Sequence, residues 1–325
     1  MSKMPEPIMT EPELTAPVMG EPDPVTPERA NRLAWARRRR SLATYWKTFR
    51  KSRQGMVGLC ILGFFVVLAL TAPYIVDLTQ IAPATADGPI LHPPTAGYPL
   101  GTDNFGRNVL SMVVYGSRIS LLIGFTATVG AMAIGSSMGI AAGYFGGRTD
   151  TILSAITNWF LVLPWIVLAI VLATVNPFHL PDLGNIILVI AITSWAGTAR
   201  LVRAQTLSVK ERTYVERSRA LGSGNWHLVT RHVLPNVMPV IYANTVLMVA
   251  IAILSEAALS FLGLGPANTV SWGTILQESY DNGALTAGYW WWFLPPGIAI
   301  VLVALSVTLC GYALDEILNP RLRDR

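Results

Sequence analysis

Six long apolar segments constrain the fold of this chain more than any other feature of its sequence. A helix needs roughly 20 apolar residues to cross a membrane whose hydrocarbon core is about 30 Å thick. Segments of this length cover residues 55–75, 119–143, 151–174, 186–207, 240–262 and 293–314. Only 13% of the 325 residues are charged, whereas soluble domains carry about 25%. The sequence therefore predicts an all-α integral membrane protein with six transmembrane helices.

The first 45 residues differ in composition from the rest of the chain. Residues 1–29 contain seven prolines and six acidic residues, and they lack the apolar core of a signal peptide. Because such a segment buries too little apolar surface to fold, we expect a disordered, basic cytoplasmic tail over residues 1–45 and a membrane domain over residues 46–325. Four arginines at 37–40 precede the first apolar segment. In this position they favour an orientation signal over a nucleic-acid site.

Basic residues are unevenly distributed between the predicted loops. Lysine and arginine occur within residues 144–150, 200–231 and 315–325, and they are absent from residues 175–185 and 263–292. The loop at 76–118, with Arg107 and Arg118, departs from this alternation. Since cytoplasmic loops carry an excess of lysine and arginine, the pattern predicts a multi-pass protein of the plasma (inner) membrane. Both termini are expected in the cytoplasm.

Small residues recur along the second apolar segment at a spacing of four. The stripe consists of Gly135, Gly139, Gly143 and Gly147. Small residues at this spacing allow helix backbones to approach closely. The stripe therefore indicates close helix packing, either within the chain or against another subunit, and packing within the chain is the simpler expectation.

A basic, turn-rich stretch separates the fourth and fifth apolar segments. Residues 213–216, Thr-Tyr-Val-Glu, have the pattern of a capping box at a helix start. Gly222 suits the left-handed position after a helix end, and Asn225 suits the start of a second helix that leads to Pro235. We expect one apolar face in each helix, formed by Tyr214, Ser218 and Leu221 and by Trp226, Val229 and Val233.

Two interpretations of this helix pair are open from the residues alone. It is either a connector whose apolar face lies on lipid headgroups, or an element that docks in the groove of a partner protein.

The stretch resembles the cytoplasmic loop of permease subunits in ABC importers. The matching positions are Glu216, Ala220, Leu221, Gly222, His232, Leu234 and Pro235. Arg217 and Ser218 stand where two alanines are usual. In that family the helix before the glycine is the coupling helix, which sits in a groove of the ATPase subunit.

Further stretches resemble motifs of the peptide/nickel group of these permeases. In LGTDNFGRNVLSMVVYGSRISLLIG, residues 100–124, Asp103, Gly106 and Arg107 hold the usual places and Asn108 replaces the commoner aspartate. Two later motifs of the group are similar to SEAALSFLGLG at 255–265 and NPRLR at 319–323. From about residue 45 onward, the chain is identified as the C-type inner-membrane subunit of a dipeptide- or oligopeptide-type ABC importer.

The resemblance implies a type I ABC importer-like permease fold in which this chain forms half of the translocation path for peptides. Its implied partners are a homologous second permease subunit, two ABC ATPase subunits, an extracytoplasmic substrate-binding protein and the lipid bilayer. ATP and Mg²⁺ would bind to the ATPase subunits, and no cofactor to this chain. Coupling through residues 214–233 is expected to involve Tyr214, Glu216, Arg217, Arg219, Ala220, Leu221, Gly222, Trp226, Leu234 and Pro235.

The sequence shows no pattern for chemistry of its own. No Gly-x-x-x-x-Gly-Lys-Ser/Thr phosphate loop occurs, so we do not expect this chain to hydrolyse ATP or to be an enzyme. The histidines at 92, 179, 227 and 232 lack the spacing of metal ligands, and no Ser/His/Asp or Cys/His arrangement indicates hydrolysis. We therefore expect neither a catalytic site nor a metal site.

Two groups of charged residues are further candidates. Glu256 lies within the fifth apolar segment, where an ionisable side chain either contributes to the translocation path or has a structural partner. Asp103 and Arg107 lie beside Gly106 in the predicted outer loop. They either pair with each other or brace the binding protein.

Three other functions compete with that of a peptide-importer permease. A nickel or glutathione importer permease would share the same motifs. A stand-alone secondary transporter would favour inverted repeats and intramembrane carboxylate relays, and the sequence displays neither. A membrane-anchored scaffold would not require the glycine-rich, motif-bearing segments.

Overall fold

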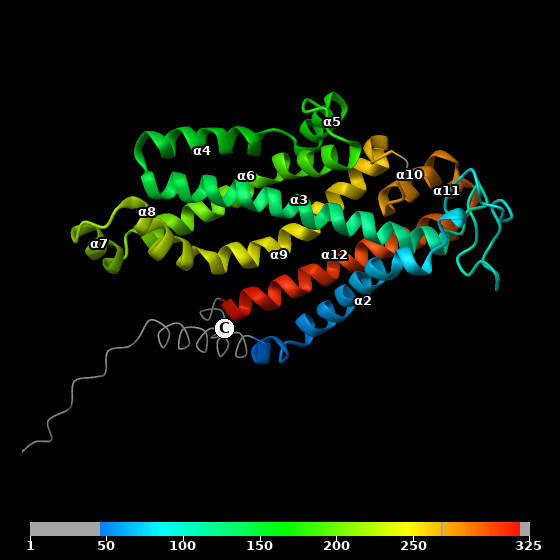
Figure 1. Cartoon of the computed structure of the whole chain (residues 1–325), viewed down its shortest axis with the longest axis horizontal. Helices are drawn as coiled ribbons and strands as arrows, with labels where there is room; N and C mark the ends of the chain where they lie inside the picture. The colour runs from blue at the N-terminus through cyan, green and yellow to red at the C-terminus, as the bar shows by residue number, and fades with distance from the viewer. Residues whose placement is uncertain (1–45, 268, 319–325) are drawn as a thin grey trace, which may run out of the picture. The chain divides into compact units, whose positions relative to one another are not determined.

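The computed structural model describes residues 46–267 and 269–318. The predicted tail at 1–45 and the motif at 319–323 lie outside the described residues. From Lys47 onward, the described residues form one compact unit. The long helices of this unit are α2 (Arg53–Ile75), α3 (Val109–Phe145), α6 (Asp182–Lys210), α9 (Leu234–Leu259) and α12 (Trp290–Leu318) (Figure 1).

Shorter helices connect the long ones. They are η1 (Leu78–Gln80), α4 (Gly147–Val162), α5 (Trp165–Val175), α7 (Thr213–Ala220), α8 (Asn225–Leu228), η2 (Val229–Val233), η3 (Ser260–Leu264), α10 (Trp272–Asp281) and α11 (Ala284–Ala287). The predicted all-α fold class is confirmed, since every regular element of the described residues is a helix.

Five of the six predicted crossings form continuous helical stretches. Residues 53–75, 109–145, 182–210, 225–264 and 290–317 are each long and apolar enough to cross a membrane. Each of these stretches contains a segment predicted from the sequence and extends beyond it at one end or both. Apolar length therefore located these crossings, but it did not fix where the helices begin and end.

The third predicted crossing, at 151–174, is wrong as one continuous helix. The structure forms α4 and α5 there, bent by 93° at the break between them. Pro164 explains the break, because proline has no N–H to donate and disfavours helical geometry at the residue before it. Leu163 has the expected extended backbone, with ψ 134°. The chain has six candidate crossings only if α4 and α5 count as one broken span.

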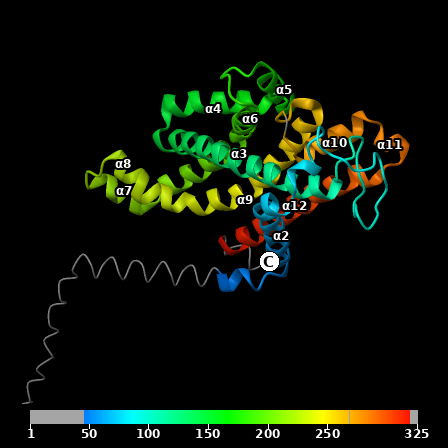
Figure 2. The same ribbon diagram turned by 45° about the vertical axis from the view of Figure 1, so that its right-hand side comes forward.

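The helix α3 packs along α6, and Figures 1 and 2 show the two side by side. A Cβ atom added to Gly135 or to Gly139 would lie 2.6 Å from a backbone carbonyl oxygen of α6. At Gly143 it would lie 2.7 Å from the Cβ atom of Thr206. Because larger residues would force the backbones apart, the glycine stripe is used for packing within the chain. Gly147 does not share this contact, since the space around it is open.

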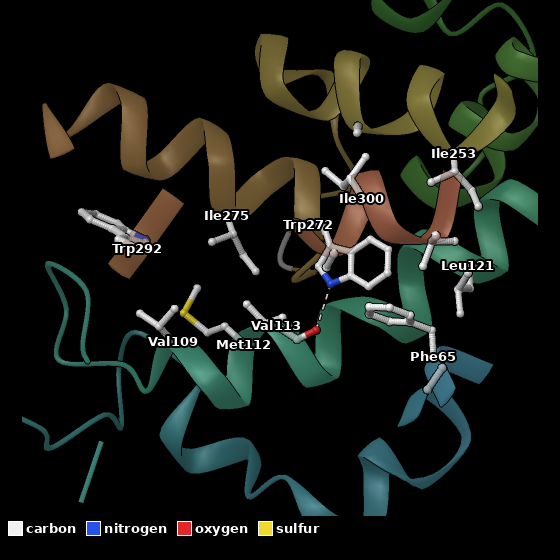
Figure 3. Packing of buried hydrophobic residues seen from close by; sticks show 14 of the residues in the cluster. Phe65, Val109, Met112, Val113, Leu121, Ile253, Trp272, Ile275, Trp292 and Ile300 are labelled. Carbon is white, nitrogen blue, oxygen red and sulfur yellow. Dashed lines mark hydrogen bonds between the residues drawn. The ribbon is translucent and has the colours of Figure 1, made fainter. Parts of the chain in front are cut away.

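A large hydrophobic cluster joins α2, α3, α10 and α12 (Figure 3). Trp272, the first residue of α10, is fully buried, and its Nε1 donates a hydrogen bond to the Val113 carbonyl oxygen at 2.9 Å. The Phe65 ring meets the Trp272 ring edge-on, with 5.5 Å between their centroids. Through these contacts the short helix α10 is fixed to the long helices. The helices α10 and α11 lie at the end of the unit opposite α7 and α8 (Figures 1 and 2).

Candidate functional site

The candidate site is the helix pair α7 and α8, which projects from the end of α6. The predicted capping box at 213–216 is wrong, because Thr213 already lies within α7 and Arg212 is the N-cap residue, with no side-chain cap. Glu216 instead lies in the first turn of α7. A carboxylate there interacts favourably with the positive end of the helix dipole.

The glycine turn after α7 has the predicted geometry. Gly222 has φ +84°, a left-handed conformation that glycine adopts at little cost. The Ser223 N–H donates to the Ser218 carbonyl at 3.2 Å, and the Gly222 N–H donates to the Arg219 carbonyl at 3.0 Å. This pair of bonds is a Schellman motif. It sets the direction in which the chain continues from α7 to α8.

Buried side chains fix the helix pair to the long helices. Val215 of α7, Leu228 of α8 and Val233 of η2 are fully buried, and they belong to one cluster with residues of α3, α6 and α9. Tyr144, near the end of α3, is also buried, and its hydroxyl donates to Asn225 Oδ1 at 2.9 Å. The helix pair is therefore anchored from both sides of the turn.

The expected common face of Trp226, Val229 and Val233 is wrong. Trp226 is exposed, whereas Val233 is fully buried. Pro235 supplies the physical reason, because it has no N–H to donate and its ring would clash with the carbonyl four residues earlier. The Leu234 N–H bonds instead to the Val229 carbonyl, five residues earlier. This wider π-helical turn changes the angular spacing along the helix.

Three large apolar or aromatic side chains of the helix pair remain exposed. The exposed fractions are 39% for Tyr214, 87% for Leu221 and 81% for Trp226. We call these three side chains the tip surface. Ser218, expected on a face with Tyr214 and Leu221, is only half-exposed and its hydroxyl bonds to the Ser223 hydroxyl.

Charged and small residues surround the tip surface. Those that the sequence singled out are exposed, namely Glu216, Arg217, Arg219, Ala220 and Gly222, together with Pro235 at the start of α9. Leu234 is half-buried. The Arg219 guanidinium also lies 5.9 Å from the centre of the Tyr144 ring. The predicted coupling residues thus gather around one turn, with apolar side chains rimmed by charge.

Two histidines also meet at this turn. The His227 and His232 rings lie 5.8 Å apart, and the Tyr214 ring lies 6.0 Å from His232. Sequence reasoning missed this arrangement because the irregular turn at η2 sets it. No group of three or more potential metal-ligating side chains occurs among the described residues.

The outer-loop residues Asp103 and Arg107 form a structural contact at the opposite end of the unit from the helix pair. Arg107 Nε donates to Asp103 Oδ2 at 2.5 Å, and both side chains are almost fully buried. Arg107 also pairs with Glu278 of α10, a partner that the sequence did not reveal. Burial raises the pKa of Glu278, whereas the Arg107 charge lowers it.

Gly106, between Asp103 and Arg107 in the outer loop, has little room for a side chain. A Cβ atom on Gly106, whose φ is +74°, would lie 2.2 Å from the Gly88 carbonyl oxygen.

Glu256 is fully buried within this chain. Its Oε1 accepts a hydrogen bond from the Ser260 hydroxyl at 2.8 Å. Among the described residues, Oε2 has no hydrogen-bond partner. The side chain does not reach the surface of the chain, and the Ser260 hydroxyl that bonds to it comes from the following helical turn. This placement matches the structural interpretation of Glu256 more closely than the path-lining one.

Comparisons with known proteins bear on these assignments. A family model described as binding-protein-dependent transport system inner membrane component matches residues 131–324. That stretch covers more than half of the chain and includes the helix pair. The chain belongs to this family. A second model, the N-terminal TM domain of oligopeptide transport permease C, matches residues 42–94.

Curated relatives and a solved structure support the same assignment. The dipeptide transport system permease protein DppC of Bacillus subtilis is 34% identical over 86% of this chain and 85% of its own length. The oligopeptide transport system permease protein OppC of Lactococcus lactis is 36% identical over 71% of this chain and 78% of its own length.

The inward-facing MetNI methionine ABC transporter superposes with a TM-score of 0.52 at 21% identity. The superposition covers 64% of this chain and 95% of the transporter chain. The expected permease family and importer-like fold are therefore confirmed, and the roles of individual residues stay predictions.

Proposed function

We propose that this permease is one transmembrane subunit of an ATP-driven importer of peptides, and that its tip surface docks on an ATPase subunit. The observation that carries the proposal is the exposure of Tyr214, Leu221 and Trp226 on a helix pair anchored by buried side chains. The relatives named as dipeptide and oligopeptide permeases support peptides as the substrate class.

Docking is physically favourable because the tip surface is apolar and already in place. Covering a large apolar side chain contributes roughly 1.5–3 kcal/mol relative to leaving it in water. The anchored turn loses little conformational freedom on binding, which reduces the cost of association. The exposed charges of Arg217 and Arg231 are placed to meet acidic groups at the rim of such a groove.

A movement of the tip surface has a direct route into the membrane helices. The turn η2 continues without interruption into α9, which packs against α3, α6 and α12. Closure of the ATPase subunits around ATP and Mg²⁺ would displace α7 and α8, and α9 would transmit the displacement to the transport path. In this scheme the present chain binds no cofactor and performs no catalysis.

The assembly and its orientation follow from the same proposal. This chain pairs with a homologous permease subunit, two ATPase subunits and an extracytoplasmic substrate-binding protein. The end with α7 and α8 lies in the cytoplasm, together with both termini, in agreement with the seven basic residues at 200–231. The opposite end, with α10 and α11, faces the binding protein.

Peptide uptake into proteoliposomes tests the proposal. The variant Leu221→Asp places a charge on the tip surface, so docking should lose at least the burial of one leucine, or about tenfold in affinity. ATP-driven uptake with added ATPase subunits should fall accordingly. Leu285→Asp is the matched control for binding of the ATPase subunits, because Leu285 is 57% exposed on α11 at the opposite end, and this variant should retain them with wild-type affinity. Uptake driven by an ion gradient without ATPase subunits would refute the proposal.

A further inference from the structure

A polar cavity lies between α3, α4 and α6, away from the tip surface. Its volume is about 250 Å³. The α4 and α6 side chains that line it include Ser154, Thr157, Asn158, Arg200 and Arg203, and α3 contributes Met138, Gly139 and Ala142. Figures 1 and 2 show α4 running beside α3 and α6. The cavity opens to the surface, because Asn158 and Arg200 are both exposed.

The two arginines of this cavity differ in how their charge is balanced. Arg203 donates from Nε and Nη2 to the two carboxylate oxygens of Asp150, at 2.5 and 2.6 Å. Arg200 donates from Nη2 to the neutral amide oxygen of Asn158, at 2.9 Å. Within the part of the chain that the structure describes, no carboxylate forms an ion pair with Arg200. One full positive charge at the cavity therefore has no counter-charge.

The position of Arg200 makes this unbalanced charge significant. Arg200 lies ten residues before Lys210, the end of a candidate membrane span. Charged side chains within a membrane-spanning helix or at its edge usually have a partner of opposite charge. The remaining N–H groups of Arg200 and the Asn158 amide N–H₂ are available to such a partner.

We propose that this cavity binds an oxyanion, with Arg200 as its charged ligand and Asn158 as a hydrogen-bond donor. Arginine is well suited to this role because its planar donors match the geometry of phosphate and carboxylate oxygens. The cavity is smaller than the roughly 300–1,000 Å³ of sites that enclose drug-sized molecules, so it fits a single anionic group. That group is either the phosphate of an anionic lipid or a carboxylate of the transported solute.

Lipid retention tests the phosphate source. The full chain, purified with the subunits that accompany it, is placed in nanodiscs of phosphatidylcholine with or without phosphatidylglycerol. Native mass spectrometry then counts the retained lipids. If the phosphate of a lipid is the ligand, wild type should retain a phosphatidylglycerol molecule that Arg200→Gln loses. Arg148→Gln is the matched control, because Arg148 is exposed at the start of α4 and does not line the cavity, so this variant should behave as wild type.

Dipeptide binding tests the carboxylate source, and only this arm rests on the proposed function. If a carboxylate of the solute is the ligand instead, calorimetric titration with dialanine should show binding to wild type that Arg200→Gln removes, while phosphatidylglycerol retention stays unchanged. Asn158→Leu serves as a second variant, since it keeps the side-chain size and removes the donor, and it should weaken the same ligand as Arg200→Gln.

If neither substitution changes the retention of phosphatidylglycerol or the binding of dialanine, the proposal is wrong. That result would leave the proposed function intact, because the uptake test depends on the tip surface and not on this cavity.

Discussion

Tyr144 ties α3 to the start of α8. Its ring is buried in the cluster that contains Val215, Leu228 and Val233, and its hydroxyl bonds to Asn225. Tyr144 directly follows the predicted apolar segment at 119–143, and nothing in the sequence indicated a contact with a residue 81 positions later. Contacts at such separations depend on how the helices pack, which local patterns do not encode.

Replacing Tyr144 with phenylalanine should loosen the helix pair while preserving its core. The loss of one hydrogen bond costs about 1 kcal/mol, because Asn225 Oδ1 loses a donor and the ring stays in place. Amide hydrogen exchange at residues 225–233 should therefore become faster. Tyr312→Phe is the control, because Tyr312 is 59% exposed on α12. Equal exchange in both variants would show that the Tyr144 hydroxyl does not position α8.

Gly106 is the residue whose backbone most restricts substitution in the outer loop. Gly106→Ala should lower the free energy of unfolding by about 1–3 kcal/mol, because alanine is strained at positive φ and its Cβ would meet the Gly88 carbonyl. Gly97→Ala is the matched control, since the space around Gly97 is open and its φ is not positive. Thermal unfolding in detergent would measure both. Similar midpoints for the two variants would contradict this account.

At the scale of elements, apolar length predicted most of the helices but missed one break. The third crossing fails as a continuous helix at Leu163 and Pro164, and the proline was visible in the sequence. Hydropathy alone did not reveal the break, because proline disrupts helical geometry but hardly lowers the apolar character of the segment. The helix pair shows the same limit. Gly222 predicted its turn, whereas the π-helical turn before Pro235 changed which side chains face outward.

The contact between α3 and α6 yields a prediction at this scale. Gly139→Ala should destabilise the unit by about 1–3 kcal/mol, because the added methyl group overpacks a closely fitted interface. Gly197→Ala, on α6, is the matched control, since the space around Gly197 is open. Alanine also favours helix over glycine, so the control should be neutral or slightly stabilising. An unchanged unfolding temperature for Gly139→Ala would indicate that α3 and α6 separate at little cost.

At the scale of the whole molecule, sequence motifs were more informative than physical patterns. Apolar segments and charge asymmetry predicted a multi-pass membrane protein, and the motifs around Gly222 and Asp103 pointed to the family that the comparisons confirm. The contact of Arg107 with Glu278, 171 residues apart, came only from the structure. The cavity between α3, α4 and α6 also came only from the structure, because residues of three separate helices line it.

The central claim is that the tip surface is held by a separate ATPase subunit and not by lipid headgroups. Site-specific photo-crosslinking in native membranes tests it most directly, with benzoyl-phenylalanine in place of Trp226 and, as a control, in place of Leu285. Both side chains are exposed, and they belong to α8 and α11, which lie at opposite ends of the unit (Figure 1). The account predicts a covalent adduct with the ATPase subunit from position 226 alone. Adducts with lipid only at 226, or with the ATPase subunit only at 285, would contradict it.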